Sequence, residues 1–178
     1  KFKMRSCLWK TLLLLVFFLY LSTSAYAGST YVLPYPSQMP GNKFYTINQV
    51  IEKISYFWYF GNFGKTYYYQ KLSDKYLVEA KTLFEYKQYL LAYKSLLKSN
   101  RYFEKIYPYL LSAKKEGKDI SEKQKIFRQE SLKHLEELNK LKNSTPEEFL
   151  WTPEKSKPTL LNIHSLIEVS MNIRKKYL

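Results

Sequence analysis

Apolar residues recur every three or four positions along most of the chain, which is the spacing of an amphipathic helix. This pattern predicts helices over about 43–60, 65–117, 121–143 and 159–178. Glycine-containing segments separate the first three of them, and no segment alternates apolar and polar residues for long. The short connections imply that neighbouring helices run antiparallel. The chain is therefore predicted to be all-α, an antiparallel helical bundle of four to five helices.

The longest helical segment is expected to contain two helices. Its apolar register restarts after Lys87, and residues 80–92 resemble the middle of a tetratricopeptide unit, in which small residues let two helices pack closely. A shift of the sequence by 34 residues finds no second copy, because Ala80 then falls on Lys114. Repeat arrays need about three units to be stable. We therefore expect one close-packed helical hairpin in place of a repeat array.

The first 27 residues have the layout of a secretory signal peptide. Four basic residues and no acidic one precede or flank an apolar run at 11–21, and Ala25 and Ala27 stand before Gly28 as an A-x-A cleavage site. An uncleaved membrane anchor is the alternative, but a spanning helix needs about 20 apolar residues, roughly twice the length of this run. We expect cleavage after Ala27 and an extracytoplasmic protein, either secreted or associated with the cell envelope.

Four segments are expected after the signal peptide (1–27). A Pro-rich extended segment (28–42) leads into the helical bundle (43–143), and a Pro-containing linker (144–158) joins the bundle to a C-terminal amphipathic helix (159–178). Three prolines within seven positions of the first segment favour extended backbone and suppress helix.

Composition excludes several classes of protein. The chain has 29 Lys and Arg against 15 Asp and Glu, a net charge of +14, and without the signal peptide it keeps 25 against 15, or +10. Its one cysteine, Cys7, leaves with that peptide, so neither a disulfide framework nor a thiolate zinc site can form in the remaining domain. Apolar residues at 46% and aromatic residues at 18% argue against a disordered chain.

Candidates for catalysis are few. His134 and His164 are the only histidines, and neither has a glutamate three residues before it, so the Glu-x-x-His pattern of di-iron bundles is missing. The sequence has no Gly-x-Ser-x-Gly nucleophile elbow and no phosphate-binding loop. We therefore expect no catalytic residues, no cofactor, no metal site, and a protein that is not an enzyme.

Two features indicate a binding surface instead. Nine aromatic residues lie within residues 56–69, too many for all of them to face one core. Basic residues recur along the segments that follow. The candidate binding residues are Trp58, Tyr59, Tyr68, Lys94, Lys98, Arg101 and Lys105. A basic surface outside the cytoplasm favours a protein or an anionic envelope component and allows a peripheral membrane contact, whereas export argues against nucleic acid.

An L-P-x-P-G-type motif opens the mature chain, and its residues here are Leu33, Pro34, Pro36, Pro40 and Gly41, with Ser37 where glycine is usual. With this motif and residues 72–80, the chain resembles an uncharacterised bacterial family of exported all-helical domains, a domain of unknown function. The likeness covers about 31–141. It implies export and a helical bundle and carries no activity.

These observations predict a non-enzymatic helical interaction module that is exported or associated with the envelope. Its partner is an unknown protein or an anionic envelope component. Two alternatives remain open. One is a small-ligand-binding or weakly hydrolytic domain that uses a histidine near the aromatic segment. The other is a membrane-anchored scaffold with an uncleaved N-terminal helix.

Overall fold

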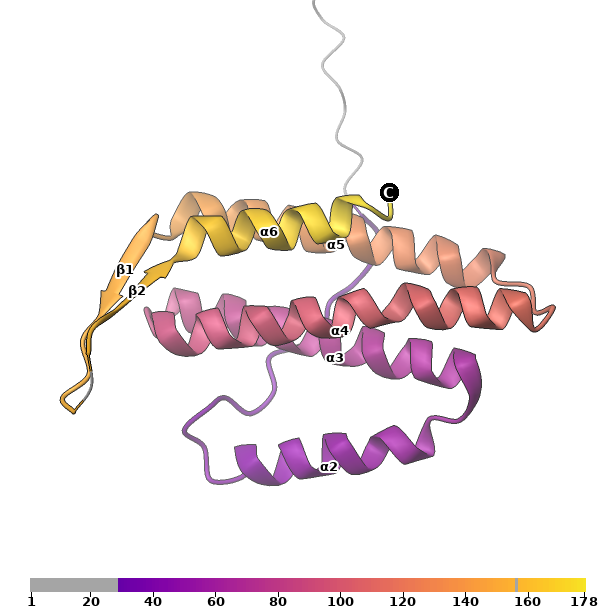
Figure 1. The fold of residues 1–178 in the computed structure, drawn as a ribbon, viewed down its shortest axis with the longest axis horizontal. Helices are drawn as coiled ribbons and strands as arrows, with labels where there is room; N and C mark the ends of the chain where they lie inside the picture. Colours follow the sequence, from indigo (N-terminus) through magenta and orange to yellow (C-terminus); the bar gives the residue numbers. More distant parts are fainter. Residues whose placement is uncertain (1–28, 156) are drawn as a thin grey trace, which may run out of the picture.

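The computed structural model describes residues 29–178 apart from residue 156. Within this range it contains five helices and one small sheet: α2 (Tyr45–Trp58), α3 (Gly61–Glu85), α4 (Tyr89–Lys115), α5 (Ser121–Ser144), β1 (Glu148–Trp151), β2 (Thr159–Asn162) and α6 (Ile163–Lys175). The prediction of an all-α bundle of four to five helices is confirmed (Figure 1). The predicted signal peptide and its cleavage residues, Ala25, Ala27 and Gly28, lie outside the described residues.

An antiparallel hairpin of α3 and α4 forms the centre of the molecule, with α5 and α6 together on one side of it and α2 on the other (Figure 1). The two central helices pack closely because small side chains meet between them: Ala80 and Ala92 are fully buried. Backbone hydrogen bonds from Lys87 to Phe84 and from Gln88 to Leu83 end α3 and reverse the chain. The expected single helical hairpin around residues 80–92 is confirmed.

Two clusters of buried side chains make up the core. The first is aliphatic and joins α3, α4, α5 and α6 at the end of the bundle that carries the small sheet. The second is aromatic and lies farther along the same helices, with Tyr69, Tyr76, Phe103 and Phe127 among its members. Tyr69 stacks on Tyr109, with 5.4 Å between ring centroids. Much of the aromatic excess of the sequence is therefore used inside the bundle.

A β-hairpin, which the sequence pattern did not indicate, takes up part of the predicted linker and the first four residues of the predicted C-terminal helix. β1 and β2 pair antiparallel, with Phe149 opposite Leu161. Each strand has only four residues, too few for alternation to stand out from the helical pattern around it. Phe149 packs on Tyr89 at the start of α4, with 4.5 Å between ring centroids. The C-terminal helix consequently begins at Ile163 and not at the predicted residue 159.

The described part of the Pro-rich segment has no regular secondary structure before the turn at residue 40, and it runs across the bundle. Ser29 Oγ donates a hydrogen bond to the backbone oxygen of Gln129 on α5. Leu33 and Met39 pack against the aliphatic core cluster, while Pro34 is exposed. Residues 29–39 therefore form a strap over the surface, anchored by side chains at both of its ends.

Candidate functional site: a buried polar network and an exposed basic stripe

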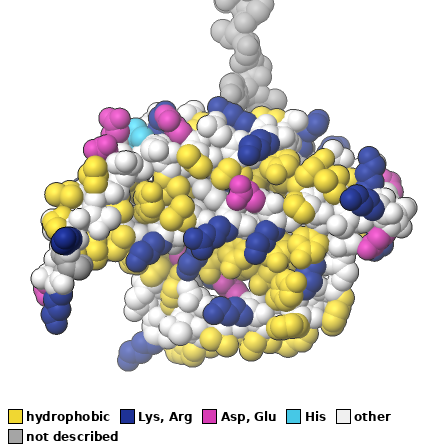
Figure 2. Space-filling view, viewed as in Figure 1, with side chains coloured by type: hydrophobic (Ala, Val, Ile, Leu, Met, Phe, Trp, Pro, Cys, Tyr) yellow, Lys and Arg dark blue, Asp and Glu magenta, His cyan; other side chains and the backbone are white. Residues whose placement is uncertain are grey.

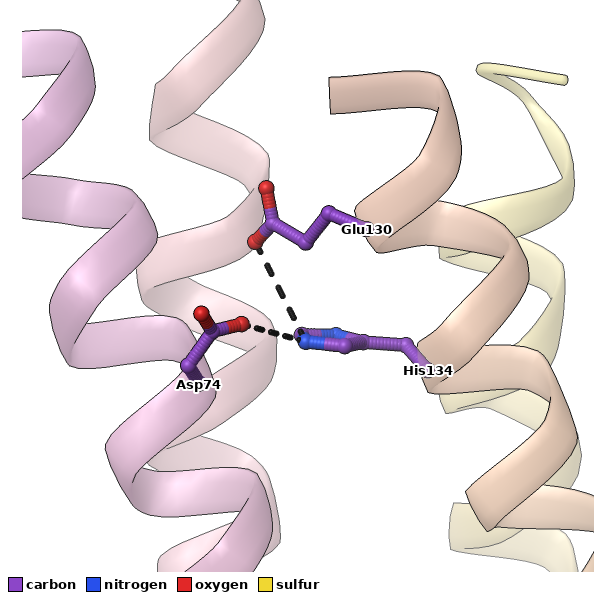
Figure 3. A group of neighbouring side chains, drawn as sticks. All are labelled: Asp74, Glu130 and His134. Carbon is purple, nitrogen blue, oxygen red and sulfur yellow. Dashed lines mark hydrogen bonds and ion pairs between the residues drawn. The ribbon is translucent and has the colours of Figure 1, made fainter. Parts of the chain in front are cut away.

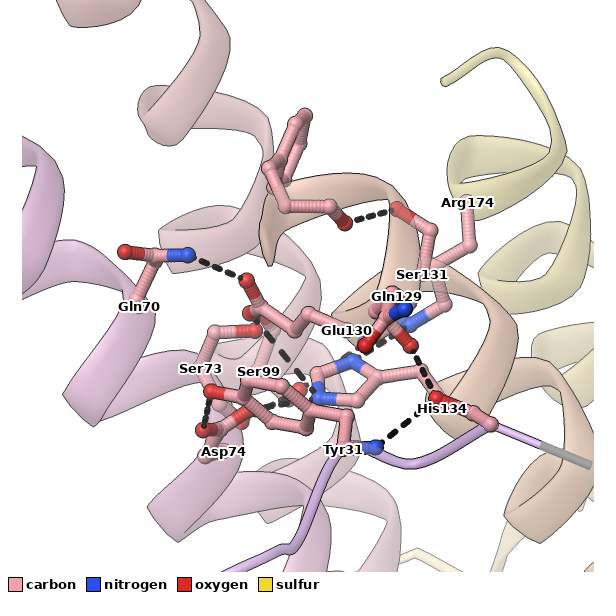
Figure 4. Close-up of polar contacts among 12 residues, drawn as sticks. Tyr31, Gln70, Ser73, Asp74, Ser99, Gln129, Glu130, Ser131, His134 and Arg174 are labelled. Carbon is pink, nitrogen blue, oxygen red and sulfur yellow. Dashed lines mark hydrogen bonds and ion pairs between the residues drawn. The ribbon is translucent and has the colours of Figure 1, made fainter. Parts of the chain in front are cut away.

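Charged side chains gather in the core of the bundle, where apolar residues are the rule. Asp74 comes from α3, Glu130 and His134 from successive turns of α5, and Arg174 from the last turn of α6. Glu130, His134 and Arg174 are fully buried, and Asp74 is nearly so. Figure 3 shows both carboxylates directed towards the imidazole, and Figure 4 shows the surrounding polar contacts. We refer to these four residues as the buried network.

His134 is held at both ring nitrogens. Its Nε2 lies 2.7 Å from Asp74 Oδ1, and Arg174 Nε donates to its Nδ1 over 3.1 Å. Because arginine can only donate, Nδ1 must accept and the ring proton must sit on Nε2, which donates to Asp74. Burial, reinforced by the charge of Arg174 and opposed by Asp74, lowers the pKa of His134. The imidazole is therefore neutral at neutral pH, with one fixed tautomer.

Arg174 uses the rest of its guanidinium to bond to α4 and to its own helix, α6. Its terminal nitrogens donate to Asn100 Oδ1 over 2.6 Å and to Ser99 Oγ over 2.9 Å on α4, and to the backbone oxygen of Ser170 over 2.9 Å on α6. Burial lowers the pKa of Arg174 to about 9, which still leaves it charged at neutral pH. The planar guanidinium can direct several donors at once, so it satisfies a set of acceptors that a lysine could not.

The two carboxyl groups have different surroundings. Asp74 accepts from His134 and, at Oδ2, from the hydroxyl of Tyr31 over 2.6 Å. Glu130 accepts from Gln70 over 2.8 Å at Oε2, whereas its buried Oε1 has no hydrogen-bond partner. Burial, followed by the negative charge of Asp74, raises the pKa of Glu130 well above its usual value. The raised pKa favours the protonated form of Glu130, which lowers the cost of burying this carboxyl group in the core.

Asp74, Glu130 and His134 also have the residue types of a metal site, and one ligand atom from each lies within 4.8 Å of the others. The hydrogen bonding does not fit a metal, however. A histidine that binds a metal through Nε2 donates from its other nitrogen, usually to a carboxylate or carbonyl, whereas Nδ1 of His134 accepts from a cation. That cation would also repel a divalent ion in the same enclosed space. The hydrogen bonding of the imidazole therefore fits a polar network and not a metal site.

Solvent reaches only the edge of this network. A groove of about 490 Å³ beside the strap is lined by Asp74 and Gln70 together with Tyr31, Phe63 and Tyr67, and the imidazole is not part of its lining. A hydrolytic role for His134 would need a substrate to reach the ring. The burial of the ring is typical of a structural residue.

The other histidine lies at the start of α6, beside the small sheet. His164 Nε2 lies 3.0 Å from the backbone oxygen of Thr145, and the side chain lines a shallow depression with Glu147, Glu148 and Glu168. The aromatic segment is at the opposite end of α3 from this depression (Figure 1). Within the described residues, neither histidine shares an accessible pocket with the aromatic segment.

The basic candidates of α4 form one stripe. Lys94, Lys98, Arg101 and Lys105 follow helical spacing along about 16 Å of the helix. Lys98 is half-buried and the other three are exposed. None of the four has a carboxylate within 4.0 Å among residues 29–155 and 157–178. A row of Lys and Arg side chains crosses the visible face at about the height of α4 (Figure 2). We refer to the four as the basic stripe.

The aromatic candidates separate. Trp58, at the end of α2, is 67% exposed, and Tyr59 beside it is half-buried. Tyr68 is buried in the aromatic core cluster, so its selection as a surface residue was wrong. Tyr68 lies on the side of α3 that meets α2, where its hydroxyl donates to the backbone oxygen of Glu52. Sequence spacing alone could not show which of several adjacent rings would face inward.

Comparison with known proteins finds one family. The model of the family described as "Domain of unknown function (DUF5667)" matches residues 37–148, which is more than half of the chain. The chain belongs to this family. No curated protein and no solved structure matches it.

The DUF5667 region supplies most of the buried network but not all of it. Its match begins after Leu33, Pro34 and Pro36 and ends at the first residue of β1. Arg174 therefore comes from a helix beyond the matched region. No helix within the described part of this DUF5667 protein is both long and apolar enough to cross a membrane.

Sequence reasoning missed the buried network because its members are far apart in the chain. The available signal was Glu130 four residues before His134, which places both on one face of a helix. Asp74 and Arg174 carry no comparable signal, since only the packing of α3 and α6 against α5 brings them to the imidazole.

Proposed function

We propose that this DUF5667 protein is a non-enzymatic, extracytoplasmic module that binds a phosphate-bearing anionic component of the cell envelope through the basic stripe. The observation that carries the proposal is the row of four basic side chains on α4 without carboxylate partners in the described structure. Glu104, the one acidic residue of α4, points about a quarter turn away from the stripe. The stripe is therefore an unneutralised linear array of positive charge.

Two further features support this proposal. The excess of basic over acidic residues gives the whole chain a positive field, which would attract an anionic surface over a distance of several ångströms. The signal-peptide pattern would direct the chain out of the cytoplasm, where lipid headgroups and wall polymers are the abundant polyanions. In addition, the imidazole of the buried network is closed to substrates.

Binding to two sources of phosphate tests the proposal. The probes are vesicles containing phosphatidylglycerol and a soluble phosphodiester wall polymer, each titrated across a salt series. Replacing Lys94, Lys98, Arg101 and Lys105 by Gln is expected to weaken binding at least ten-fold, since each basic residue near an anionic surface contributes about 1 kcal/mol. The matched control replaces four other exposed lysines, Lys114, Lys115, Lys123 and Lys125, and removes the same charge.

Equal losses in the stripe variant and the control would contradict a defined site, because only net charge would then matter. Binding to neither probe at low salt would contradict the proposal as a whole. Binding to only one of them would identify the source of the phosphate.

A further inference from the structure

The helix α2 presents its apolar side to solvent. None of its residues is buried. The large apolar side chains that are about half or more exposed are Phe44, just before the helix, and Ile47, Val50, Ile51, Ile54, Phe57 and Trp58. At about 100° per residue, these positions all fall on one side of the helix. Hydrophobic side chains line the lower edge of the molecule along α2 (Figure 2).

The opposite, polar side of α2 faces the bundle. Tyr45 donates to Glu79 over 2.9 Å, and Glu52 accepts from Tyr76 over 2.8 Å and pairs with Lys75. These partners all belong to α3, and the rings of Tyr56 and Tyr59 also pack on Tyr68 of that helix, so contacts with α3 set the orientation of α2. Rotating the helix to bury its apolar side would break them and leave Glu79, which is almost fully buried, without one of its donors. The outward direction of the apolar side is thus part of the fold.

We propose that α2 is a membrane-surface helix that inserts its apolar side into the interface of an anionic lipid bilayer. Isoleucine, phenylalanine and tryptophan on one side of a helix are the usual composition of an interfacial helix, and Trp58 favours the boundary between headgroups and acyl chains. A helix of 14 residues is about 21 Å long, shorter than the roughly 30 Å hydrocarbon core. α2 is therefore suited to lie on the membrane and not to cross it.

Charge favours an anionic bilayer as the occupant. The basic stripe runs beside α2. Lys98 Nζ lies 6.0 Å from the centroid of the Tyr45 ring, at the start of α2. Lys105 Nζ lies 5.3 Å from the centroid of the Tyr69 ring, and Tyr69 contacts Tyr56, near the end of α2. Lys53 is an exposed cation on α2 itself. A second copy of the chain would bring the same positive charges together, which is unfavourable, whereas anionic headgroups would meet them with opposite charge.

This inference rests on the proposed function for the anionic nature of the surface, and it adds that the source of the phosphate is a lipid. The test uses the chain expected after cleavage, residues 28–178, with Trp151→Phe, so that Trp58 is its only tryptophan and the apolar run at 11–21 cannot contribute to binding. Phosphatidylglycerol–phosphatidylcholine vesicles with brominated acyl chains are added, and Trp58 emission and co-sedimentation are measured. We expect a blue shift and quenching of Trp58, and neither with phosphatidylcholine alone.

A matched pair of variants isolates the apolar side of α2. Ile51→Glu with Ile54→Glu is expected to reduce vesicle binding at least ten-fold. The control, Leu132→Glu with Val169→Glu, adds the same charge at exposed apolar positions on α5 and α6. Its vesicle binding is expected to stay within two-fold of that of the unsubstituted protein. All four positions are exposed, and circular dichroism checks that both variants keep their helix content.

Co-sedimentation that depends on the basic stripe, with Trp58 neither shifted nor quenched, would overturn insertion of α2 and leave the proposed function intact. Quenching of Trp58 that is unaffected by the stripe variant would support insertion while contradicting the proposed function. The inference would be overturned if Trp58 emission shifted to the blue with rising protein concentration in the absence of lipid and the molecular mass doubled. That result would assign the apolar side of α2 to contact with a second copy of the chain.

Discussion

Arg174 donates a hydrogen bond from Nε to Nδ1 of His134 over 3.1 Å, joining α6 to α5 inside the core. This contact determines the tautomer of the imidazole and directs its Nε2 proton to Asp74 on α3. One chain of polar contacts therefore ties three helices together, and the guanidinium extends it to α4. The consequence is that the stability of the bundle depends on a residue close to the C-terminus.

Replacement of Arg174 by Met is expected to destabilise the fold by about 3–5 kcal/mol, because it leaves a buried carboxylate without its compensating charge. Arg174→Lys keeps the charge but loses the fork of donors, so it should cost less. Combining Arg174→Met with Asp74→Asn should recover part of the loss, since the unpaired charge is then absent. Urea unfolding followed by circular dichroism measures all three. A loss below about 1 kcal/mol for Arg174→Met would show that the network is not stabilising.

Replacement of Glu130 by Gln is expected to change the pH dependence of stability. Burial and then Asp74 raise the pKa of Glu130 in the folded state, so above pH 4.5 the folded chain holds a proton that the unfolded chain has released. Wild-type stability should fall as pH rises through that range, by up to about 1.4 kcal/mol per pH unit. Glutamine keeps the shape and removes the titration. Glu130→Gln should therefore gain stability relative to wild type as the pH rises above 4.5.

Urea titrations at several pH values test the Glu130 prediction. Two parallel stability curves would show that Glu130 has the same pKa in the folded and unfolded states.

Glu137 is expected to affect the pH dependence of stability in the opposite direction from Glu130. Burial acts to raise its pKa, but hydrogen bonds from Lys81 and Lys140, at 2.7 Å and 2.9 Å, lower it to about 2. The stabilisation is complete above pH 4.5 and is lost as pH falls towards 2. Glu137→Gln should be less stable than wild type by on the order of 2 kcal/mol at pH 7, and the difference should disappear below about pH 2. Acid unfolding curves of the two proteins provide the measurement.

The strap is expected to loosen when the hydroxyl of Tyr31 is removed. That hydroxyl donates to Asp74 Oδ2 over 2.6 Å, and a hydrogen bond to a charged group contributes about 1.5–3 kcal/mol. Tyr31→Phe should increase proteolytic cleavage and amide exchange within residues 29–39 while the helices remain protected. Tyr35→Phe is the control, because Tyr35 is 95% exposed. Equal cleavage in the two variants would show that this bond does not hold the strap.

Much of the fold follows from the spacing of apolar residues. The restart of the register after Lys87 indicates two helices, and the small residues Ala80 and Ala92 indicate that they pack closely; both expectations hold. The β-hairpin could not be recognised in the same way, because Phe149 and Leu161 belong to strands of four residues whose pairing depends on a contact across the linker.

Among the binding candidates, too, sequence spacing predicts the position of some residues and not of others. Lys94, Lys98, Arg101 and Lys105 could be placed on one side of a helix from spacing alone, and the structure places them there. The aromatic segment could not be divided into core and surface: Tyr68 is buried and Trp58 is exposed although both follow the same pattern.

The helical class, the central hairpin, the positive charge and the spacing of the basic stripe can all be predicted from the amino-acid sequence. These properties depend on residues close together in the chain, for which helical geometry sets the relative directions. Contacts between helices, in contrast, set the outward direction of the apolar side of α2 and bring together Asp74, Glu130, His134 and Arg174 in the core. Periodicity tells which side chains share a face, but the neighbouring helix decides whether that face is buried, and here polar partners on α3 attract the polar side of α2.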